Sequence, residues 1–139
     1  MIILDTNVIS EAMTFSPNAK VLLWLSSQPP QLLFTTTVSM AEILFGIELL
    51  PVGKRRSGLL KTAETMFATL FAGRILAFDE SGARAFSGIA AARRMRGRPM
   101  ATLDAQIVAI CRANDATLAT RNTAHFEYCD VQLMNPWLH

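Results

Sequence analysis

Short apolar runs alternate with longer stretches of helical pattern along this chain, and that alternation limits the folds it can adopt. The first run is Ile2–Leu4, which leads directly into Asp5. Three aliphatic residues in succession are typical of a strand that is buried on both faces of a parallel sheet. Strands that alternate with helices indicate an α/β domain. We therefore predict an α/β fold with a mainly parallel central sheet of four to five strands.

The order of the predicted elements fits this fold class. Strands are predicted at residues 2–5, 32–37, 74–79, 117–122 and 131–135. Helices are predicted at residues 8–13, 17–28, 38–50, 55–72, 80–96 and 101–115. In the second helix, Ser16 would be the N-cap and Pro17 the first helical residue. The link 97–101 is too short to carry the chain back along the whole fifth helix, so we expect that helix to tilt or to cross.

Length and composition favour one domain over residues 1–139. Hydrophobic residues make up 51% of the 139-residue chain and charged residues 17%, which is typical of a globular protein. No apolar stretch approaches the roughly 18 residues that span a bilayer, and the N-terminus has no basic region followed by a cleavage site. Cys111 and Cys129 lack CxxC spacing, so we expect reduced thiols. These features favour a cytoplasmic protein without a membrane partner.

Four polar residues are expected at one edge of the sheet. Asp5 ends the first strand, Glu42 lies about one turn into the helix after the second strand, and Asn122 follows the fourth. The carboxyl ends of parallel strands meet at one edge, where ligands bind. Only the link Asp115-Ala116 joins the last helix to the fourth strand, so that helix must run antiparallel to the strand. Asp104, at the start of the helix, therefore reaches the same edge.

Each acidic residue also has a structural explanation on its own. Asp5 or Asn7 would cap the short helix that follows. Ser39 and Glu42 fit the capping box S-x-x-E, in which the glutamate reaches back to a backbone N–H. Asp104 falls in the first turn of its helix, where the helix dipole favours an anion.

Taken together, the carboxylates favour a metal site. Three carboxylates in one crevice repel each other, and no Lys or Arg lies at a spacing that obviously neutralises them all. A divalent cation would do so. Oxygen ligands without a His or Cys pair favour Mg²⁺ or Mn²⁺ over Zn²⁺. Such sites polarise a phosphate and lower the pKa of a bound water, so phosphodiester hydrolysis is the chemistry that this arrangement suits.

The basic residues are mostly arginine, although the net charge is only +2. Four of them cluster in the segment "RRMRGR" at residues 93–98, and a second basic run covers residues 54–56. Arginine clusters suit bidentate contacts to phosphate. A solvated helix end explains each run equally simply.

Three segments in order resemble the PIN-domain nucleases, most closely the VapC/FitB toxins of bacterial type II toxin–antitoxin pairs. They are "MIILDTNVISE", "TVSMAEILFGIELL" and "MATLDAQIVAICRANDATLATRNTAHF", while "LLPVGKRR", "FAGRILAFDE" and "NPWLH" point to the FitB-like branch. The resemblance implies a three-layer α/β/α sandwich and Mg²⁺-dependent endoribonuclease activity, with Mn²⁺ as a substitute. It also implies silencing by a cognate antitoxin, a small DNA-binding protein encoded alongside.

The resemblance also implies roles for particular residues. Asp5, Glu42 and Asp104 would bind the metal, and Glu42 would orient or deprotonate the attacking water. Thr6 or Asn7 would orient Asp5, and Thr120 would support the site by hydrogen bonding. The family commonly has Asp at a fourth position, which here is Asn122. An amide brings no charge, which favours one ion, or a second ion that arrives with the substrate.

Further residues are assigned within the same interpretation. The candidate RNA phosphate contacts are Arg121, Arg93, Arg94, Arg96 and Arg98. Asp79 ends a strand at the same edge, and we interpret it as a helix cap. His125 is interpreted as a surface or turn residue and not as a base.

Other functions are weighed against this one. A HAD-type phosphatase or a receiver domain needs a second Asp near Asp5 and a late Lys, but this chain has Asn7 and no Lys after Lys61. The more serious alternative is a catalytically weakened PIN-like module that binds RNA or a partner without cleavage, because of Asn122.

The apolar stretches Ile43–Leu50 and Leu59–Phe71 bear on partners. They would form a groove for an antitoxin helix and a homodimer face, with a higher assembly once antitoxin binds, or they are ordinary core helices. No recognition-helix motif appears here, so DNA binding would belong to the antitoxin.

Overall fold

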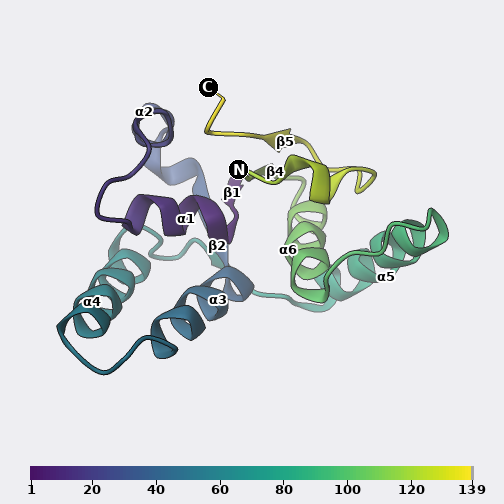
Figure 1. Ribbon diagram of the computed structural model, residues 1–139. Coiled ribbons are helices and arrows are strands. Elements are labelled where there is room, and N and C mark those ends of the chain that lie inside the picture. Colours follow the sequence, from purple (N-terminus) through teal and green to yellow (C-terminus); the bar gives the residue numbers. More distant parts are fainter. Residues whose placement is uncertain (139) are drawn as a thin grey trace.

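The computed structural model describes residues 1–138 and contains a parallel sheet between two groups of helices (Figure 1). The strands are β1 (Ile2–Leu4), β2 (Leu33–Thr36), β3 (Ile75–Leu76), β4 (Thr117–Ala119) and β5 (Leu133–Met134). They lie side by side in the order β3-β2-β1-β4-β5, and every neighbouring pair is parallel. The predicted α/β fold with a mainly parallel sheet is confirmed.

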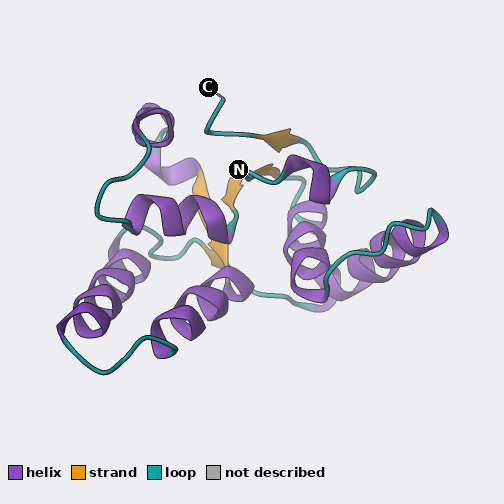
Figure 2. Ribbon diagram, viewed as in Figure 1, coloured by secondary structure: helices purple, strands orange, loops and turns teal. Residues whose placement is uncertain are grey.

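The α-helices follow the predicted order. They are α1 (Thr6–Met13), α2 (Ala19–Ser27), α3 (Thr37–Glu48), α4 (Lys54–Thr69), α5 (Glu80–Met95) and α6 (Thr102–Ala113). Two short 3₁₀ helices, η1 (Pro30–Leu32) and η2 (Thr123–Phe126), precede β2 and follow β4. Figure 2 shows the strands in orange between the helices α1–α4 and the pair α5 and α6. In the described part of the chain, no helix is both long and apolar enough to cross a membrane.

The apolar strands face two cores, one on each side of the sheet. Ile3 and Leu118 pack into the core that α6 dominates, whereas Leu4 and Ala119 pack into the core formed with α1–α4. Successive residues of a strand point to opposite faces. Both faces are therefore covered, which explains why β1 is continuously apolar.

Some predicted boundaries are wrong. The N-cap of α2 is Asn18, whose side chain accepts hydrogen bonds from the N–H groups of Lys20 and Val21, so Ser16 and Pro17 lie in the preceding loop. The edge strand β3 has two residues in place of six, because only β2 pairs with it. Asp79 caps α5 by accepting from Gly82 N–H, as expected.

Two other expectations hold. The helix α5 packs against α6 and extends away from the sheet at an angle, and the chain returns from its end to the start of α6 (Figure 1). The chain path therefore brings the start of α6, with Asp104, to the carboxyl edge of the strands.

The second expectation concerns the cysteines. Cys111 and Cys129 are both free thiols and both buried.

Candidate active site

Asp5 lies buried at the carboxyl end of β1, with 5% of its surface exposed. It is also the N-cap of α1, because its Oδ1 accepts a hydrogen bond of 2.8 Å from the backbone N–H of Thr6. Its Oδ2 accepts a bond of 2.8 Å from the hydroxyl of Thr120 and a longer one of 3.4 Å from Asn7. The expectation that Asp5 caps the short helix is therefore confirmed, and its second oxygen is held by side chains from two other positions.

The Thr120 hydroxyl holds Asp5 from the end of β4. It donates its only proton to Asp5 and accepts from the Asn7 amide at 3.3 Å and from the Asn122 backbone N–H at 3.1 Å. Both lone pairs and the proton of this hydroxyl are thus used. Because Thr120 is completely buried, water does not compete for these bonds, and the carboxylate of Asp5 is fixed in one orientation.

Glu42 faces the site from the first half of α3. Its Oε1 accepts a hydrogen bond of 2.8 Å from the hydroxyl of Thr6, which also shares a 2.9 Å hydrogen bond with the hydroxyl of Ser39. The capping-box interpretation of Ser39 and Glu42 is wrong. The N-cap of α3 is Thr36, whose side chain accepts from Ser39 N–H. Glu42 is therefore free of its own helix end and is held by α1.

Asp104 enters the site from the first turn of α6. Partial burial raises the pKa of its carboxyl, and the nearby His125 lowers it. His125 lies exposed in η2, as expected of a surface residue. Its proximity to Asp104 could not be predicted, because it depends on how the chain turns after β4.

The three acids influence one another. Burial is the largest cause that raises the pKa of Asp5, and the charges of Asp104 and Glu42 raise it further. The hydrogen bonds from Thr120 and from Thr6 N–H lower that pKa and oppose the increase. Among residues 1–138, no salt bridge involves any of the three acids. The fold therefore gathers negative charge at this edge of the sheet, as predicted, and supplies no ion pair to compensate it.

The donor set fits a hydrated hard cation. Over the described residues, no three His, Cys, Asp or Glu side chains are close enough to hold one metal ion directly. Mg²⁺ commonly keeps several waters and takes only one or two carboxylates. Two oxygens of Asp104 and one of Glu42 accept no hydrogen bond from the rest of the described protein. Those oxygens suit an ion that reaches some carboxylates through water.

Thr6 and Asn7 both contact Asp5, as one or the other was expected to do, and each also makes further contacts. The Thr6 side chain orients Glu42, while only its backbone contacts Asp5. Asn7 bridges Thr120 and the backbone N–H of Arg121, which its Oδ1 accepts at 3.2 Å. The guanidinium of Arg121 lies 5.2 Å from the centre of the Trp137 ring. Asn122 follows, exposed at the rim of the site.

Arg93 has a structural role, and the prediction that it contacts phosphate is wrong. It is 5% exposed, and its guanidinium donates to the backbone carbonyls of His125 at 2.8 Å and Glu127 at 3.0 Å. Its Nε donates to the carbonyl of Arg98 at 2.7 Å. These contacts fasten the end of α5 to the loop after η2. Its guanidinium is therefore not available to a ligand.

The other arginines of the cluster are exposed. The guanidinium of Arg96 lies 4.1 Å from the centre of the Tyr128 ring, and that of Arg98 lies 5.5 Å from it. Arg98 also pairs with Glu127 at 3.3 Å. Sequence reasoning missed Tyr128, because about thirty residues separate it from the arginines. Arg94 is exposed at the end of α5.

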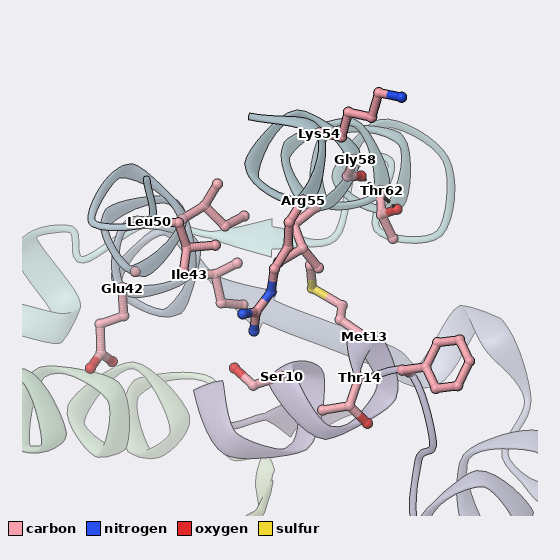
Figure 3. Close-up of a pocket in the computed structure, with 14 residues that line it drawn as sticks. Ser10, Met13, Thr14, Glu42, Ile43, Leu50, Lys54, Arg55, Gly58 and Thr62 are labelled. Atoms are coloured by element: carbon pink, nitrogen blue, oxygen red, sulfur yellow. Dashed lines mark hydrogen bonds between the residues drawn. The ribbon is translucent and has the colours of Figure 1, made fainter. Parts of the chain in front are cut away.

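A cavity of about 760 Å³ lies between α1, α3 and α4. Its apolar lining comes from Met13, Ile43, Ile47, Leu50 and Leu59. Lys54 and Arg55 add positive charge, and Figure 3 shows Arg55 extending from α4 into the cavity toward Ser10. Glu42 also lines it. We call this space the α1–α3–α4 cavity, and it adjoins the acidic site through Glu42.

Comparison with known sequences identifies relatives over the whole length. The PIN domain family model matches residues 2–131. The plasmid stability protein StbB of Pseudomonas syringae pv. tomato is 43% identical over 137 residues, which cover 99% of both chains. Toxin FitB of Neisseria gonorrhoeae is 39% identical over 137 residues, again covering 99% of both. The VapC ribonuclease Y4jK of Sinorhizobium fredii is 35% identical over 137 residues, and the match covers 99% of this chain and 98% of that protein.

A solved structure shares the fold closely. FitAB bound to an IR36 DNA fragment contains a chain with a TM-score of 0.93 and 39% identity, covering 99% of this chain and 96% of that one. The chain described here belongs to the PIN-domain family, whose ribonucleases are typically metal-dependent. Within that family it is a toxin of the VapC/FitB type, from the toxin–antitoxin systems. The predicted family is confirmed.

Proposed function

We propose that this protein is a metal-dependent endoribonuclease that hydrolyses RNA phosphodiesters and acts in the cytoplasm as the toxin of a type II toxin–antitoxin pair. The observation that carries the proposal is the gathering of Asp5, Glu42 and Asp104 at one sheet edge, where no basic side chain forms a salt bridge with them within residues 1–138. A relative with 35% identity is named a VapC ribonuclease, which supports the same chemistry.

The acids are assigned as ligands of Mg²⁺, with Mn²⁺ as a substitute. Asp5 and Asp104 would hold the ion, and Glu42 would reach it through water. When bound, the ion polarises the scissile phosphate and lowers the pKa of a bound water. Thr120 and the N–H of Thr6 keep the Asp5 carboxylate in position.

Glu42 is assigned to orient the attacking water and to receive its proton. The Thr6 hydroxyl occupies only Oε1 of Glu42, so Oε2 is left to contact the water. Asn122 supports a site for one ion, since its amide adds no negative charge. Arg94, Arg96, Arg98 and Arg121 remain candidate phosphate contacts.

The α1–α3–α4 cavity is assigned to a helix of the cognate antitoxin, a small DNA-binding protein. Its apolar lining suits the apolar face of an amphipathic helix, and Lys54 and Arg55 suit acidic residues beside that face. Because Glu42 lines this space too, its occupant would end beside the catalytic acids. A homodimer, and a higher assembly with antitoxin, complete the proposal.

Cleavage of RNA in the presence of Mg²⁺ tests the enzymatic proposal. Wild-type protein should cleave, whereas EDTA and the substitutions Asp5→Asn and Asp104→Asn should each abolish cleavage. Cleavage that survives these controls would exclude the metal mechanism. A wild-type protein that binds RNA without cutting it would favour the alternative of a catalytically weakened binding module, to which the neutral Asn122 gives some support.

The toxin role has its own test. Expression of the wild-type gene should arrest growth, and Asp104→Ala should relieve the arrest. A neighbouring reading frame for a small DNA-binding protein should restore growth when it is expressed together with the wild type. Growth arrest that persists with Asp104→Ala would separate toxicity from the acidic site.

A further inference from the structure

Tyr128 has an unusual backbone conformation for an exposed aromatic residue. Its φ angle is 63°, in the left-handed region that glycine and asparagine adopt far more readily than a bulky residue. Its side chain is 53% exposed, so packing in a core does not explain the choice of tyrosine. Unfavourable backbone conformations that persist without a packing reason are often found at functional sites.

The loop that carries Tyr128 is held firmly. Arg93 binds the carbonyls of His125 and Glu127 on its N-terminal side. Cys129, the next residue, is 1% exposed and packs in the core with its Sγ 3.7 Å from Arg93. The ring is therefore presented to solvent from a fixed backbone, which lowers the entropy that a binding partner would have to remove.

Two guanidinium groups lie over the same ring. Arg96 is 4.1 Å and Arg98 is 5.5 Å from its centre. Arg96 forms no salt bridge with any residue in 1–138, and the pair between Arg98 and Glu127 is exposed and long at 3.3 Å. An exposed aromatic ring with exposed arginines beside it is the combination that single-stranded nucleic acid binds, by stacking and by charge.

Two segments connect this cluster to the helix that carries Asp104. The 3₁₀ helix η2, which ends two residues before Tyr128, packs against α6. Arg96 and Arg98 lie in the short segment between α5 and α6, whose first turn carries Asp104. The cluster is therefore joined on both sides to the helix that brings Asp104 to the site.

We propose that Tyr128, Arg96 and Arg98 form a binding subsite for single-stranded RNA next to the catalytic acids. A base stacks on the Tyr128 ring, and the two guanidinium groups bind the adjoining phosphates. The subsite rests on the ribonuclease function proposed above and adds to it the class of substrate. Bases in a duplex are already stacked and paired, so an unpaired segment is the form of RNA that this subsite selects.

Binding of a fluorescein-labelled single-stranded RNA of 12 nucleotides tests the subsite, measured by anisotropy in the Asp104→Asn background to prevent cleavage. Tyr128→Asn removes the ring and suits the left-handed backbone, so the variant should remain folded. We expect its Kd to rise about tenfold, in the range that loss of one base–aromatic stack produces. Tyr128→Phe should keep the parent Kd, since the ring remains.

Arg84, on α5, provides a control for the arginines that follow this helix. Arg96→Ala should raise the Kd and reduce its dependence on salt, because one phosphate contact is lost. Arg84→Ala should change neither quantity, since Arg84 pairs with Glu80 on the exposed side of α5. The same RNA annealed to its complement should bind without dependence on Tyr128.

Cleavage kinetics separate this proposal from the one on which it rests. With otherwise wild-type enzyme, Tyr128→Asn should raise KM while kcat stays within about twofold. Wild-type cleavage together with an unchanged KM and Kd in Tyr128→Asn would overturn the subsite and leave the ribonuclease function intact. A variant that altered dimerisation or antitoxin binding but not KM would also overturn it. Wild-type protein that neither binds nor cleaves RNA would refute the proposed function itself.

Discussion

At the scale of single residues, the position of the Asp5 carboxyl in the site lowers the stability of the fold. Burial and the charges of Asp104 and Glu42 hold its pKa above the ordinary value of 3.8. The folded protein therefore binds this proton more tightly than the unfolded chain does. As pH rises from about 3.8 through the raised pKa, the free energy of unfolding falls, because ionisation costs the folded state more. A bound dication would reverse this cost.

Asp5→Asn should consequently stabilise the protein in the absence of metal. At pH 7 with EDTA we expect a gain of about 0.5–2 kcal/mol in the free energy of unfolding, the range usual for a single stabilising substitution. Urea unfolding at pH 7 and pH 4 measures it. The gain should be smaller at pH 4, because the raised pKa lets the folded protein keep more of the Asp5 carboxyl protonated as the pH falls. A less stable variant at pH 7 would contradict this account of the site.

Thr120→Val should move the pH dependence of catalysis. Loss of the 2.8 Å bond to Asp5 removes an interaction that lowers the pKa of that carboxyl. The acidic limb of the profile of kcat/KM against pH should therefore shift to higher pH. Thr120→Ser keeps the hydroxyl and should keep the profile. An identical profile for both variants would show that the bond does not control the ionisation of Asp5.

At the residue scale, the sequence predicted where the acids lie better than it predicted which groups contact them. The rule that parallel strands end at one edge predicted that Asp5, Glu42 and Asp104 would lie together. Thr6 or Asn7 was expected to orient Asp5, and both contact it, but the hydroxyl of Thr6 binds Glu42. A hydroxyl has several acceptors within reach, and only the angle between α1 and α3 decides among them.

At the scale of elements, the order of strands and helices was predictable, and their ends were less so. The periodicity of apolar residues sets the type of an element, but pairing sets its length. The strand predicted at residues 74–79 therefore shrinks to Ile75–Leu76, since β3 is at the edge of the sheet. The sequence predicts that the run of arginines at the end of α5 is solvated. Arg93 is nevertheless buried, because the loop 125–129 returns over it.

Arg93→Lys should destabilise the protein by about 2–4 kcal/mol. The buried guanidinium donates to three backbone carbonyls at once, and a lysine cannot reach all three. A buried charged group that loses its hydrogen-bond partners costs about 1–3 kcal/mol or more. Thermal unfolding measures the change, and Arg94→Lys is the control, which should stay within about 0.5 kcal/mol because Arg94 is exposed. Equal melting temperatures would show that the clamp between α5 and the loop is dispensable.

At the scale of the whole molecule, topology rules were sufficient for the fold but not for the surfaces. A chain of alternating strands and helices has few arrangements open to it, and the observed sheet is one of them. The sequence favoured neither of two interpretations of the apolar stretches Ile43–Leu50 and Leu59–Phe71, a binding groove or an ordinary core. The structure shows both: Ile43, Ile47 and Phe67 are buried, while Phe45 and Leu49 remain exposed.

Gly46 offers a way to close the α1–α3–α4 cavity without disturbing the core. It lines that cavity from α3, and no heavy atom lies within 4 Å of the position that a Cβ would take. A large side chain there has room in the folded protein but would occupy the space assigned to the antitoxin helix. Gly46→Trp should therefore fold normally, since loss of a helical glycine is neutral or stabilising by up to about 1 kcal/mol.

The protein encoded by the neighbouring reading frame is the probe. Its affinity for Gly46→Trp, measured by calorimetry, should fall at least about tenfold, because blocking a helix-binding cavity removes contacts at the centre of the interface. Gly88→Trp on α5, where the Cβ position is equally open, should bind it like the wild type. Growth arrest by Gly46→Trp should also persist when that protein is expressed. Equal affinity for both variants would place the antitoxin on another face, since a tryptophan in the cavity leaves no room for a helix.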